Sequence, residues 1–590
     1  YALSPFTVSG LGGATSAEAH LGIVASDITA YGTGITVSEV IDYVRGSHAN
    51  EGTNGGPLRN RLRAFGDIIG SKPEVIRATS FGYETLPAVE GGGSDDSVSG
   101  TYAHFLKQKR AKDPVLFVGS NDGMLHAFDA TETGGDLLFS VMPNGSLGLV
   151  KELPKKTYAH HFGVDGSPAQ FDVRLGGSWK TILLTPMGAG GRSVFALDVT
   201  DAGSSFSMSS FLWEFKNANL GYTLGDPKAA YYRGNQWYVT VPNGAGANDH
   251  QARLFFLDPS DGSIEHNVVL GSSGTASDPN GLMSAVPVDS DFDGRADTVY
   301  AADLHGNVWK VVISAAGVPT VAYGGPFYVA KDASGNRQPI TGSLSAAVHH
   351  LSGQMVFFGT GKYFEVGDNT VSSTPPMETF YGVWDNGASV GGRSQLTQQS
   401  ITGEIMTTDG LARTMSNVAV DWNNEKGWYV DLAGGSTKIG GRFVGQPKVQ
   451  LGRVFFTTYT PKGDACQPGG ENRLYALSAL TGAANFGFDD ATCTDCGGVV
   501  IGSDGGAIDV PDFVVTPPGS GACRPGIDTG CELQYVDEDG NPCTAGDPGC
   551  SAVTPGAAQG CRLDIGVVLS NGTRSIGGLS CGVQSWRQLQ

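Results

Sequence analysis

The chain has no cysteine before Cys466 and no apolar run long enough to cross a membrane as a helix. Such a helix needs about 20 mostly apolar residues, so we expect no transmembrane segment. Basic residues are also scarce, because 38 Lys and Arg stand against 58 Asp and Glu, a net charge of −20. This balance argues against nucleic acid as a partner and favours solubility or the binding of divalent cations.

The sequence motifs of several large enzyme classes are missing as well. We find no G-x-S-x-G elbow, no H-E-x-x-H helix and no phosphate-binding P-loop. Two histidine pairs, His160-His161 and His349-His350, could suggest a metal site. Neighbouring residues on a strand point to opposite faces, so buried or hydrogen-bonded structural histidine is the better interpretation. We therefore predict that the protein is not an enzyme.

Glycine, in contrast, is abundant. The 590 residues include 88 Gly, whereas aromatic residues make up 9%. This combination is typical of short, well-packed strands joined by tight turns, not of a disordered chain. A chain of this length is too long for one ordinary core, so several units or one large repeat architecture is expected.

A strand–turn–strand pattern recurs along the chain. Its first copy is VLFVGSNDGMLHAFD at residues 115–129, in which a polar Asp-Gly turn separates two apolar runs. Related copies cover residues 181–198, 237–258, 285–309, 355–359 and 453–477. Repeats of this spacing without a helical period predict an all-β fold, a β-propeller of six to eight blades, about seven by analogy.

The N-terminal part differs from these repeats. Residues 36–65 have a helical pattern, with Thr36 as a possible N-cap and Glu39 behind it. The chain begins at Tyr1 without Met or a signal-peptide pattern. We therefore expect a mature or clipped form whose export signal lay upstream.

The cysteines cluster near the C-terminus in a Gly-, Pro- and Asp-rich region. Such clustering indicates disulfides and an oxidising compartment. A zinc site would need paired C-x-x-C motifs, and only Cys493-x-x-Cys496 qualifies. The odd number leaves one thiol unpaired or paired outside this chain. The nine are Cys466, Cys493, Cys496, Cys523, Cys531, Cys543, Cys550, Cys561 and Cys581.

These observations predict four parts. Residues 1–95 form a partly helical N-terminal segment, and residues 96–502 form the propeller. Residues 503–560 form a Cys-rich, disulfide-stapled insert, and residues 561–590 supply C-terminal strands that close the propeller.

One acidic stretch, DSDFDGRAD at residues 289–297, lies between two strand-like runs. Asp289, Asp291 and Asp293 match positions 1, 3 and 5 of a calcium loop, and Asp297 matches position 9. Glycine follows Asp293 where the loop needs a sharp turn, and Arg295 stands where only a backbone carbonyl is required. Position 12 is a tyrosine in place of the usual glutamate, and the flanks alternate like strands.

The charges favour a cation at this loop. Unit charges about 4 Å apart repel by about 4 kcal/mol at an effective dielectric constant near 20, and a divalent ion reverses the sign. Oxygen ligands on a flexible loop suit Ca²⁺ better than Mg²⁺. We predict a Ca²⁺ site in a β-hairpin, with Asp289, Asp291, Asp293, Asp297 and the Arg295 carbonyl as ligands. The alternative is a solvated Asp/Gly turn.

Several separated stretches resemble the C-terminal propeller of the PilY family, called PilC in some bacteria. The resemblance covers about residues 36–500 and the C-terminal end, although the large N-terminal region usual in the family is not seen in this chain. The stretches are residues 41–46, 63–68, 71–73, 117–129, 188–198, 220–225, 289–309, 358–363 and 585–589.

The resemblance implies a protein of the type IV pilus tip that binds calcium in this loop. It also implies calcium-dependent control of pilus extension against retraction, with minor pilins as partners and a place on the bacterial cell surface after export through the periplasm. Surface adhesion, to a host or an abiotic surface, and twitching motility are related expectations.

A calcium-dependent quinoprotein (PQQ) dehydrogenase is the alternative, since blade repeats such as Ala196-Leu-Asp198 resemble those of such enzymes. However, the carboxylates here lie in one local loop, and no adjacent Cys-Cys pair is present. The shared feature is therefore best explained by the scaffold, because a fold alone does not carry a function.

Overall fold

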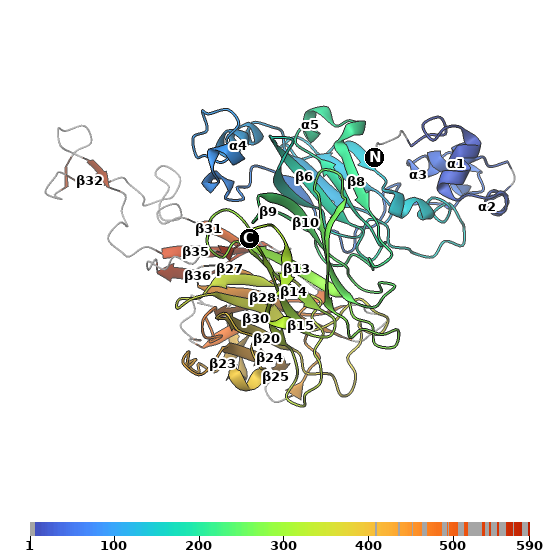
Figure 1. The fold of residues 1–590 in the computed structure, drawn as a ribbon. Helices are drawn as coiled ribbons and strands as arrows, with labels where there is room; N and C mark the ends of the chain where they lie inside the picture. Colours follow the sequence, from blue (N-terminus) through green and yellow to red (C-terminus); the bar gives the residue numbers. More distant parts are fainter. Residues whose placement is uncertain are drawn as a thin grey trace. The chain divides into compact units, whose positions relative to one another are not determined.

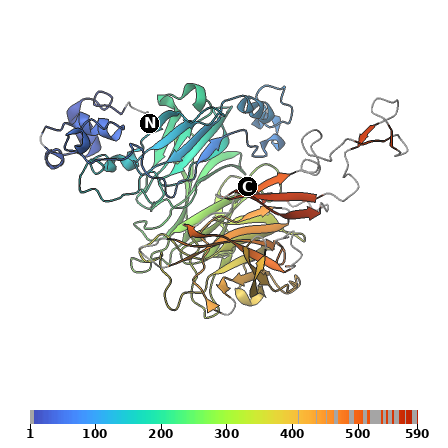
Figure 2. The ribbon, with the colours of Figure 1, turned by 180° about the vertical axis from the view of Figure 1, so that it is seen from behind.

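The computed structural model describes residues 6–505, apart from residues 33, 408–409, 435–436, 451, 463–468, 486–492 and 494, and beyond residue 505 only the strands β31 to β37. The chain divides into two compact units (Figures 1 and 2). The first consists of residues 1–330, 339–344 and 589–590, and the second of residues 331–338 and 345–588.

The first unit contains four antiparallel sheets, each built from strands consecutive in the sequence. The first two sheets hold β1 (Glu74–Ile76), β2 (Val115–Gly119), β3 (Leu125–Asp129), β4 (Leu137–Val141), and β5 (Ala169–Leu175), β6 (Ser178–Pro186), β7 (Val194–Asp198), β8 (Phe211–Phe215). The next two hold β9 (Lys228–Tyr232), β10 (Gln236–Pro242), β11 (Ala252–Leu257), β12 (Ile264–Gly271), and β13 (Leu282–Val288), β14 (Thr298–Asp303), β15 (Asn307–Ile313), β16 (Pro319–Val321), with β17 (Tyr328–Val329) beside β15.

Two six-stranded sheets are built mainly from residues of the second unit. One has the order β21 (Thr397–Gln399), β24 (Gly427–Asp431), β20 (Thr379–Asp385), β19 (Gln354–Gly359), β18 (Ser345–Val348), β37 (Gln588–Leu589). The other has the order β22 (Ile401–Thr407), β23 (Gly410–Met415), β30 (Cys496–Gly505), β29 (Gly470–Ser478), β28 (Arg453–Pro461), β27 (Lys448–Gln450). Smaller sheets contain β25 (Ala433–Gly434), β26 (Thr437–Lys438), β31 (Phe513–Thr516), β32 (Gln534–Val536), β33 (Pro542–Cys543), β34 (Ser551–Val553), β35 (Arg562–Leu569) and β36 (Gly572–Ser580).

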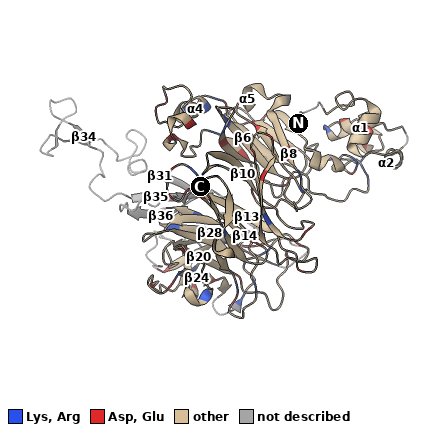
Figure 3. Cartoon of the chain, viewed as in Figure 1, with Lys and Arg blue, Asp and Glu red and all other residues tan. Residues whose placement is uncertain are grey.

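The turns between strands are held by aspartates at strand ends, as the repeated pattern indicates. Asp303, which is fully buried, accepts hydrogen bonds at Oδ1 from the backbone N–H groups of His305 (3.0 Å) and Asn307 (2.9 Å). Its Oδ2 accepts one from Trp309 Nε1 at 2.9 Å. A buried carboxylate is tolerated here because several donors satisfy it. Charged side chains are otherwise sparse along the strands (Figure 3).

Helices are confined mainly to the N-terminal part of the first unit. They are α1 (Ala14–Leu21), α2 (Ala25–Tyr31), α3 (Val37–Val44), α4 (Tyr102–Arg110) and the short α5 (Ala202–Ser205). Thr36 caps α3 as predicted, because its Oγ1 accepts from the Glu39 N–H and its own N–H donates to the Glu39 carboxylate at 2.8 Å.

The helix predicted over residues 36–65 is wrong beyond Val44. Gly46 follows with φ of 108°, and Gly52, Gly55, Gly56 and Pro57 come soon after, all unfavourable in a helix interior. Leu62, which lies within the predicted helix, is fully exposed. Helix α4 was missed, because its N-cap Thr101 lies directly behind a Gly- and Ser-rich loop.

The all-β propeller prediction is confirmed, and the partly helical N-terminal segment is present. Among the described residues, six sheets have four or more strands, against about seven blades predicted. The structure does not describe the side chains of the predicted insert at residues 503–560 or of the predicted closing strands at residues 561–590. The cysteine side chains that the structure describes are those of Cys493 and Cys496, and they form a disulfide in place of a zinc pair.

Candidate metal site

The acidic loop at residues 289–297 joins β13 to β14, which are antiparallel and paired from Val288 opposite Thr298 onward. Every residue of both strands is buried. The prediction of a loop inserted into a β-hairpin is therefore confirmed. Because the strands are fixed in the core, the two ends of the loop are held at a constant separation.

The structure brings three of the predicted ligands together. Oxygens of Asp289, Asp291 and Asp297, one from each carboxylate, all lie within 4.8 Å of one another. A calcium ion binds oxygens at about 2.4 Å, so two ligands on opposite sides of it are about 4.8 Å apart. These three carboxylates are therefore close enough together to hold one metal ion, and oxygen donors of this kind suit a hard divalent cation.

Asp297 is the most firmly held of the three, with 2% of its surface exposed. Its carboxylate accepts from the Ser290 N–H at 3.0 Å and from Ser290 Oγ at 2.8 Å. Its own N–H donates to the Val288 carbonyl at 3.0 Å, and its carbonyl accepts from the Ile313 N–H at 2.8 Å. Asp297 is thus a preorganised acceptor at the base of the loop.

Asp289 is half-buried at the start of the loop. It accepts from the N–H groups of Gly294 at 2.8 Å and Asp293 at 3.2 Å. Burial raises the pKa of the Asp289 carboxyl to about 6. The negative charges of Asp293 and Asp291 also raise this pKa, whereas the hydrogen bond from Gly294 lowers it. A cation beside this carboxylate would favour its charged form.

Asp293 has a different environment from the other three aspartates. Its Oδ1 accepts from the Arg295 N–H at 2.8 Å, and its Oδ2 lies 3.2 Å from Arg295 Nη1. The Arg295 side chain also donates through Nε to Asn235 Oδ1 at 3.1 Å and lies 2.5 Å from the Glu90 carboxylate. Asp293 is therefore engaged by Arg295, outside the group of three.

Two segments far away in the sequence hold the loop. One is the β9–β10 hairpin, whose Arg233 guanidinium pairs with Asp291 and lies 3.7 Å from Asp297 Oδ2. The other is the pair of 3₁₀ helices η2 (Tyr83–Thr85) and η3 (Ala88–Glu90). Sequence reasoning missed Arg233, Asn235 and Glu90. The Arg233-Gly-Asn turn resembles any other hairpin turn, and only the fold brings it to the loop.

The glycine of the loop is needed where the predicted turn falls. Gly294 has φ of 88°, and a Cβ added there would lie 2.8 Å from Leu86 Cδ2 and 3.1 Å from Thr85 Oγ1. Both the left-handed backbone and the close neighbour therefore disfavour a side chain at this position. Phe292 also has a positive φ, 62°, which is uncommon for a bulky residue.

His160 and His349, one from each histidine pair, contact residues outside the acidic loop. His160 Nε2 lies 2.9 Å from Asp67 Oδ2 at the surface. His349 is buried against Trp384 and Trp422, with ring centroids 4.3 and 4.4 Å apart. Burial lowers the pKa of His349 to about 4, with His350 adding to the effect. These contacts describe structural histidines.

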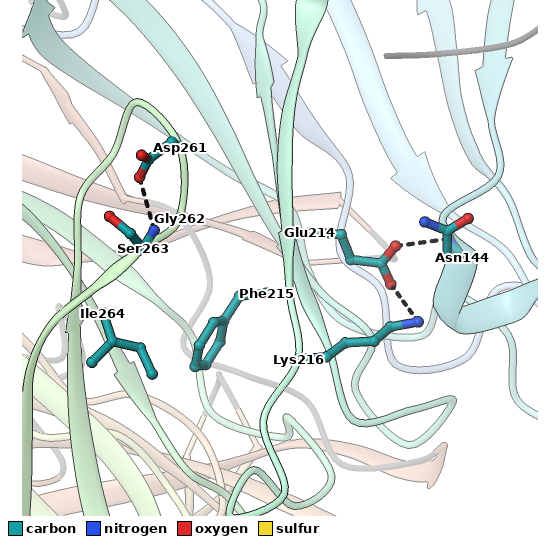
Figure 4. Close-up of a pocket in the computed structure, with 8 residues that line it drawn as sticks. All are labelled: Asn144, Glu214, Phe215, Lys216, Asp261, Gly262, Ser263 and Ile264. Atoms are coloured by element: carbon teal, nitrogen blue, oxygen red, sulfur yellow. Dashed lines mark hydrogen bonds and ion pairs between the residues drawn. The ribbon is translucent and has the colours of Figure 1, made fainter. Parts of the chain in front are cut away.

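A pocket of about 360 Å³ lies elsewhere in the first unit, beside β8 (Figure 4). Its buried Glu214 accepts from the N–H groups of Asn144 and Gly145, each at 2.8 Å, and from Ser193 Oγ at 2.8 Å. Lys216 Nζ lies 3.3 Å from the same carboxylate. Because these donors satisfy Glu214, the pocket offers a ligand no free charged group from this residue.

Within the described part of the chain, no helix is both long and apolar enough to cross a membrane.

Comparison with known proteins agrees with this architecture. The family model for the PilY1 beta-propeller domain matches residues 65–418, more than half of the chain. A type IV pilus biogenesis factor PilY1 homolog of Xylella fastidiosa (strain Temecula1) is 35% identical over 95% of this chain and 38% of that protein. The PilY1 biogenesis factor of Pseudomonas aeruginosa (strain PAK) is 32% identical over 88% of this chain and 46% of that protein.

A solved structure is also similar. The crystal structure of the Pseudomonas aeruginosa PilY1 C-terminal domain matches with a TM-score of 0.60 and 27% identity, over 77% of this chain and 96% of that domain. The chain spans less than half the length of the two relatives above. The extent of these matches shows that the chain belongs to the PilY1 family, of which it contains the β-propeller.

Proposed function

We propose that this chain is the calcium-binding, non-enzymatic part of a type IV pilus biogenesis factor. The observation that carries the proposal is the group of carboxylate oxygens of Asp289, Asp291 and Asp297, spaced for one cation. It occurs in a chain whose relatives are named type IV pilus biogenesis factors. The relatives are named as biogenesis factors and not as enzymes of a stated reaction. The geometry of the acidic loop suits the binding of an ion without catalysis.

In this proposal, Asp289, Asp291 and Asp297 bind Ca²⁺ through their side chains. Asp293 and the carbonyl of Arg295 are further ligands, as position 5 and position 7 of a calcium loop. Calcium, when bound, adds two positive charges at the point where the loop carboxylates converge. The mutual repulsion of Asp289, Asp291 and Asp293 then becomes a net attraction toward one point.

The ion sets the rigidity of a loop that touches two other segments of the first unit. Glu90 and Asn235, one from each segment, both contact Arg295 of the loop. We propose that the calcium-bound loop favours assembly and extension of the pilus and opposes its retraction. The protein would act outside the cell after export through the periplasm, at the pilus tip with minor pilins as partners. Adhesion to a host or abiotic surface and twitching motility would follow from that position.

The test is Asp291→Ala, because Asp291 is exposed and its removal leaves the buried strands intact. Isothermal titration calorimetry should show that calcium binding is lost, while circular dichroism stays unchanged and piliation of cells carrying the variant falls. Asp261→Ala is the matched control, an exposed aspartate in another Asp-Gly turn, whose carboxylate bonds the Ser263 N–H at 2.9 Å. Calcium affinity of Asp291→Ala equal to that of the wild type would refute the proposal.

A further inference from the structure

Arg233 reaches the acidic loop from a different sheet. It follows β9 directly, in the turn that leads to β10. Its backbone is fixed against the loop, because the Ala296 N–H donates to the Tyr231 carbonyl at 2.7 Å and the Arg233 N–H donates to the Ala296 carbonyl at 3.1 Å. The position of the Arg233 Cα relative to the loop therefore depends on main-chain hydrogen bonds, not on its side chain.

The guanidinium of Arg233 pairs with the same carboxylates that form the candidate cation site. Its Nη2 bonds to Asp291 Oδ2 and lies 3.7 Å from Asp297 Oδ2. Asp291 and Asp297 are two of the three members of the oxygen group. One positive charge of the protein thus already balances part of the negative charge of the loop.

The two arginines near the loop differ in how they are held. Arg295 has 15% of its side chain exposed and is shared among Glu90, Asn235 and Asp293. Its ring contact with Tyr231, 5.5 Å from the centroid, holds it further. Arg233 has 36% of its side chain exposed, and both of its ion-pair partners belong to the oxygen group. Arg233 is therefore more exposed to solvent than Arg295, which is part of the packed structure.

We propose that Arg233 is the exchangeable counterion of the acidic loop: it neutralises Asp291 and Asp297 without calcium, turns away when the ion binds, and so sets the calcium affinity. This inference rests on the proposed calcium site. A guanidinium bonded to Asp291 and a divalent ion bound by the same carboxylate are like charges a few ångströms apart, and they repel. Calcium therefore has to displace Arg233, and that cost lowers the observed affinity.

The test compares Arg233→Gln with the wild type, using calcium titration calorimetry and thermal unfolding in EGTA. The substitution removes the hydrogen bond between Arg233 and Asp291, which stabilises the calcium-free state only. The calcium affinity should therefore rise about tenfold. The melting temperature in EGTA should fall, and the increase produced by calcium should become larger. Calcium affinity that is unchanged or reduced would overturn the inference, since Arg233 would then be neutral or supportive toward the ion.

Two further variants make the result specific. Arg253→Gln also removes one positive charge, and it breaks the ion pair between Arg253 and Asp249. Arg253 lies near the opposite end of β10, because the Asn243 N–H donates to the Arg253 carbonyl at 3.0 Å. It should leave calcium affinity at the wild-type value. Arg233→Lys keeps the charge and should stay within a few-fold of the wild type. A tenfold rise in either variant would contradict the assignment to Arg233.

Failure of the calcium site itself would look different. Asp291→Asn should abolish calcium binding in both the wild-type and the Arg233→Gln background. If the wild-type protein binds no calcium, or if Asp291→Asn binds it equally well, the proposed function fails. If Asp291→Asn loses binding but Arg233→Gln gains none, only the role of Arg233 fails.

Discussion

Glu90 and Arg295 form an ion pair that joins the acidic loop to a segment 205 residues earlier in the chain, with Glu90 Oε2 2.5 Å from Arg295 Nη2. Both side chains are mostly buried, at 19% and 15% exposure. The pair is therefore screened by water less than a surface ion pair is. It links the loop to η3, which lies in the segment between β1 and β2.

Removing this pair should loosen the segment that contains η2 and η3. We expect Glu90→Gln to destabilise local structure by about 1 kcal/mol, because one hydrogen-bonded charge pair is lost. Hydrogen–deuterium exchange should show faster exchange in residues 83–93. A double-mutant cycle with Arg295→Gln checks the origin of the effect. Additive losses in the cycle would mean that the two side chains do not interact.

Gly294→Ala should destabilise the loop through both backbone strain and crowding. The left-handed conformation alone costs a non-glycine residue about 1–2 kcal/mol. The added Cβ would also meet Leu86 Cδ2 at 2.8 Å. Gly324→Ala is the matched control, since Gly324 has φ of 66° but no atom within 4 Å of an added Cβ. Thermal unfolding should show the larger loss for Gly294→Ala, and equal losses would exclude crowding against Leu86.

The second unit contains a buried carboxyl that should make its stability depend on pH. Burial raises the pKa of Glu378 to about 7, partly offset by a hydrogen bond from Thr360 Oγ1. In the unfolded chain the pKa is lower, so between the two values the folded state holds the proton and the unfolded state does not. Stability is then fully present below about pH 4.5, is lost between about pH 4.5 and pH 7, and levels off above pH 7.

Glu378→Gln removes this dependence. The difference in melting temperature between Glu378→Gln and the wild type should increase from pH 5 to pH 8. The corresponding gain in the free energy of unfolding is about 3 kcal/mol at most. Glu132→Gln, at an exposed position, should show no such change. If the difference between Glu378→Gln and the wild type is the same at both pH values, the Glu378 carboxyl does not titrate as described.

His349 should produce a dependence of the opposite sign. Burial lowers its pKa to about 4, so the folded state disfavours the charged imidazole. The stability that neutral His349 contributes is present above about pH 6.5 and is lost as the pH falls toward 4. The unfolding temperature of His349→Phe should fall less steeply than that of the wild type as the pH is lowered from 6.5 to 4. The control His161→Asn, at an exposed position, should show the same pH dependence as the wild type. A slope equal to the wild type in His349→Phe would contradict this prediction.

The sequence was sufficient for local features and insufficient for contacts between distant segments. Alternating apolar runs with Asp-Gly turns predicted hairpins such as β2–β3, because strand and turn preferences act over a few residues. The same locality placed Asp289, Asp291 and Asp297 in one loop. Arg233 and Glu90 could not be found in this way, since they lie 58 and 205 residues from their partners. The helix beyond Val44 failed for a different reason, because the prediction gave too little weight to glycines that lie within the same stretch of sequence.

The central claim is that Asp289, Asp291 and Asp297 bind one calcium ion. X-ray diffraction from crystals grown with millimolar calcium, with anomalous difference maps, tests it most directly. The account predicts an anomalous peak about 2.3–2.6 Å from an oxygen of each of the three carboxylates, with the Arg233 guanidinium turned away. A well-ordered loop with no peak among these carboxylates, and Arg233 still paired with Asp291, would contradict it.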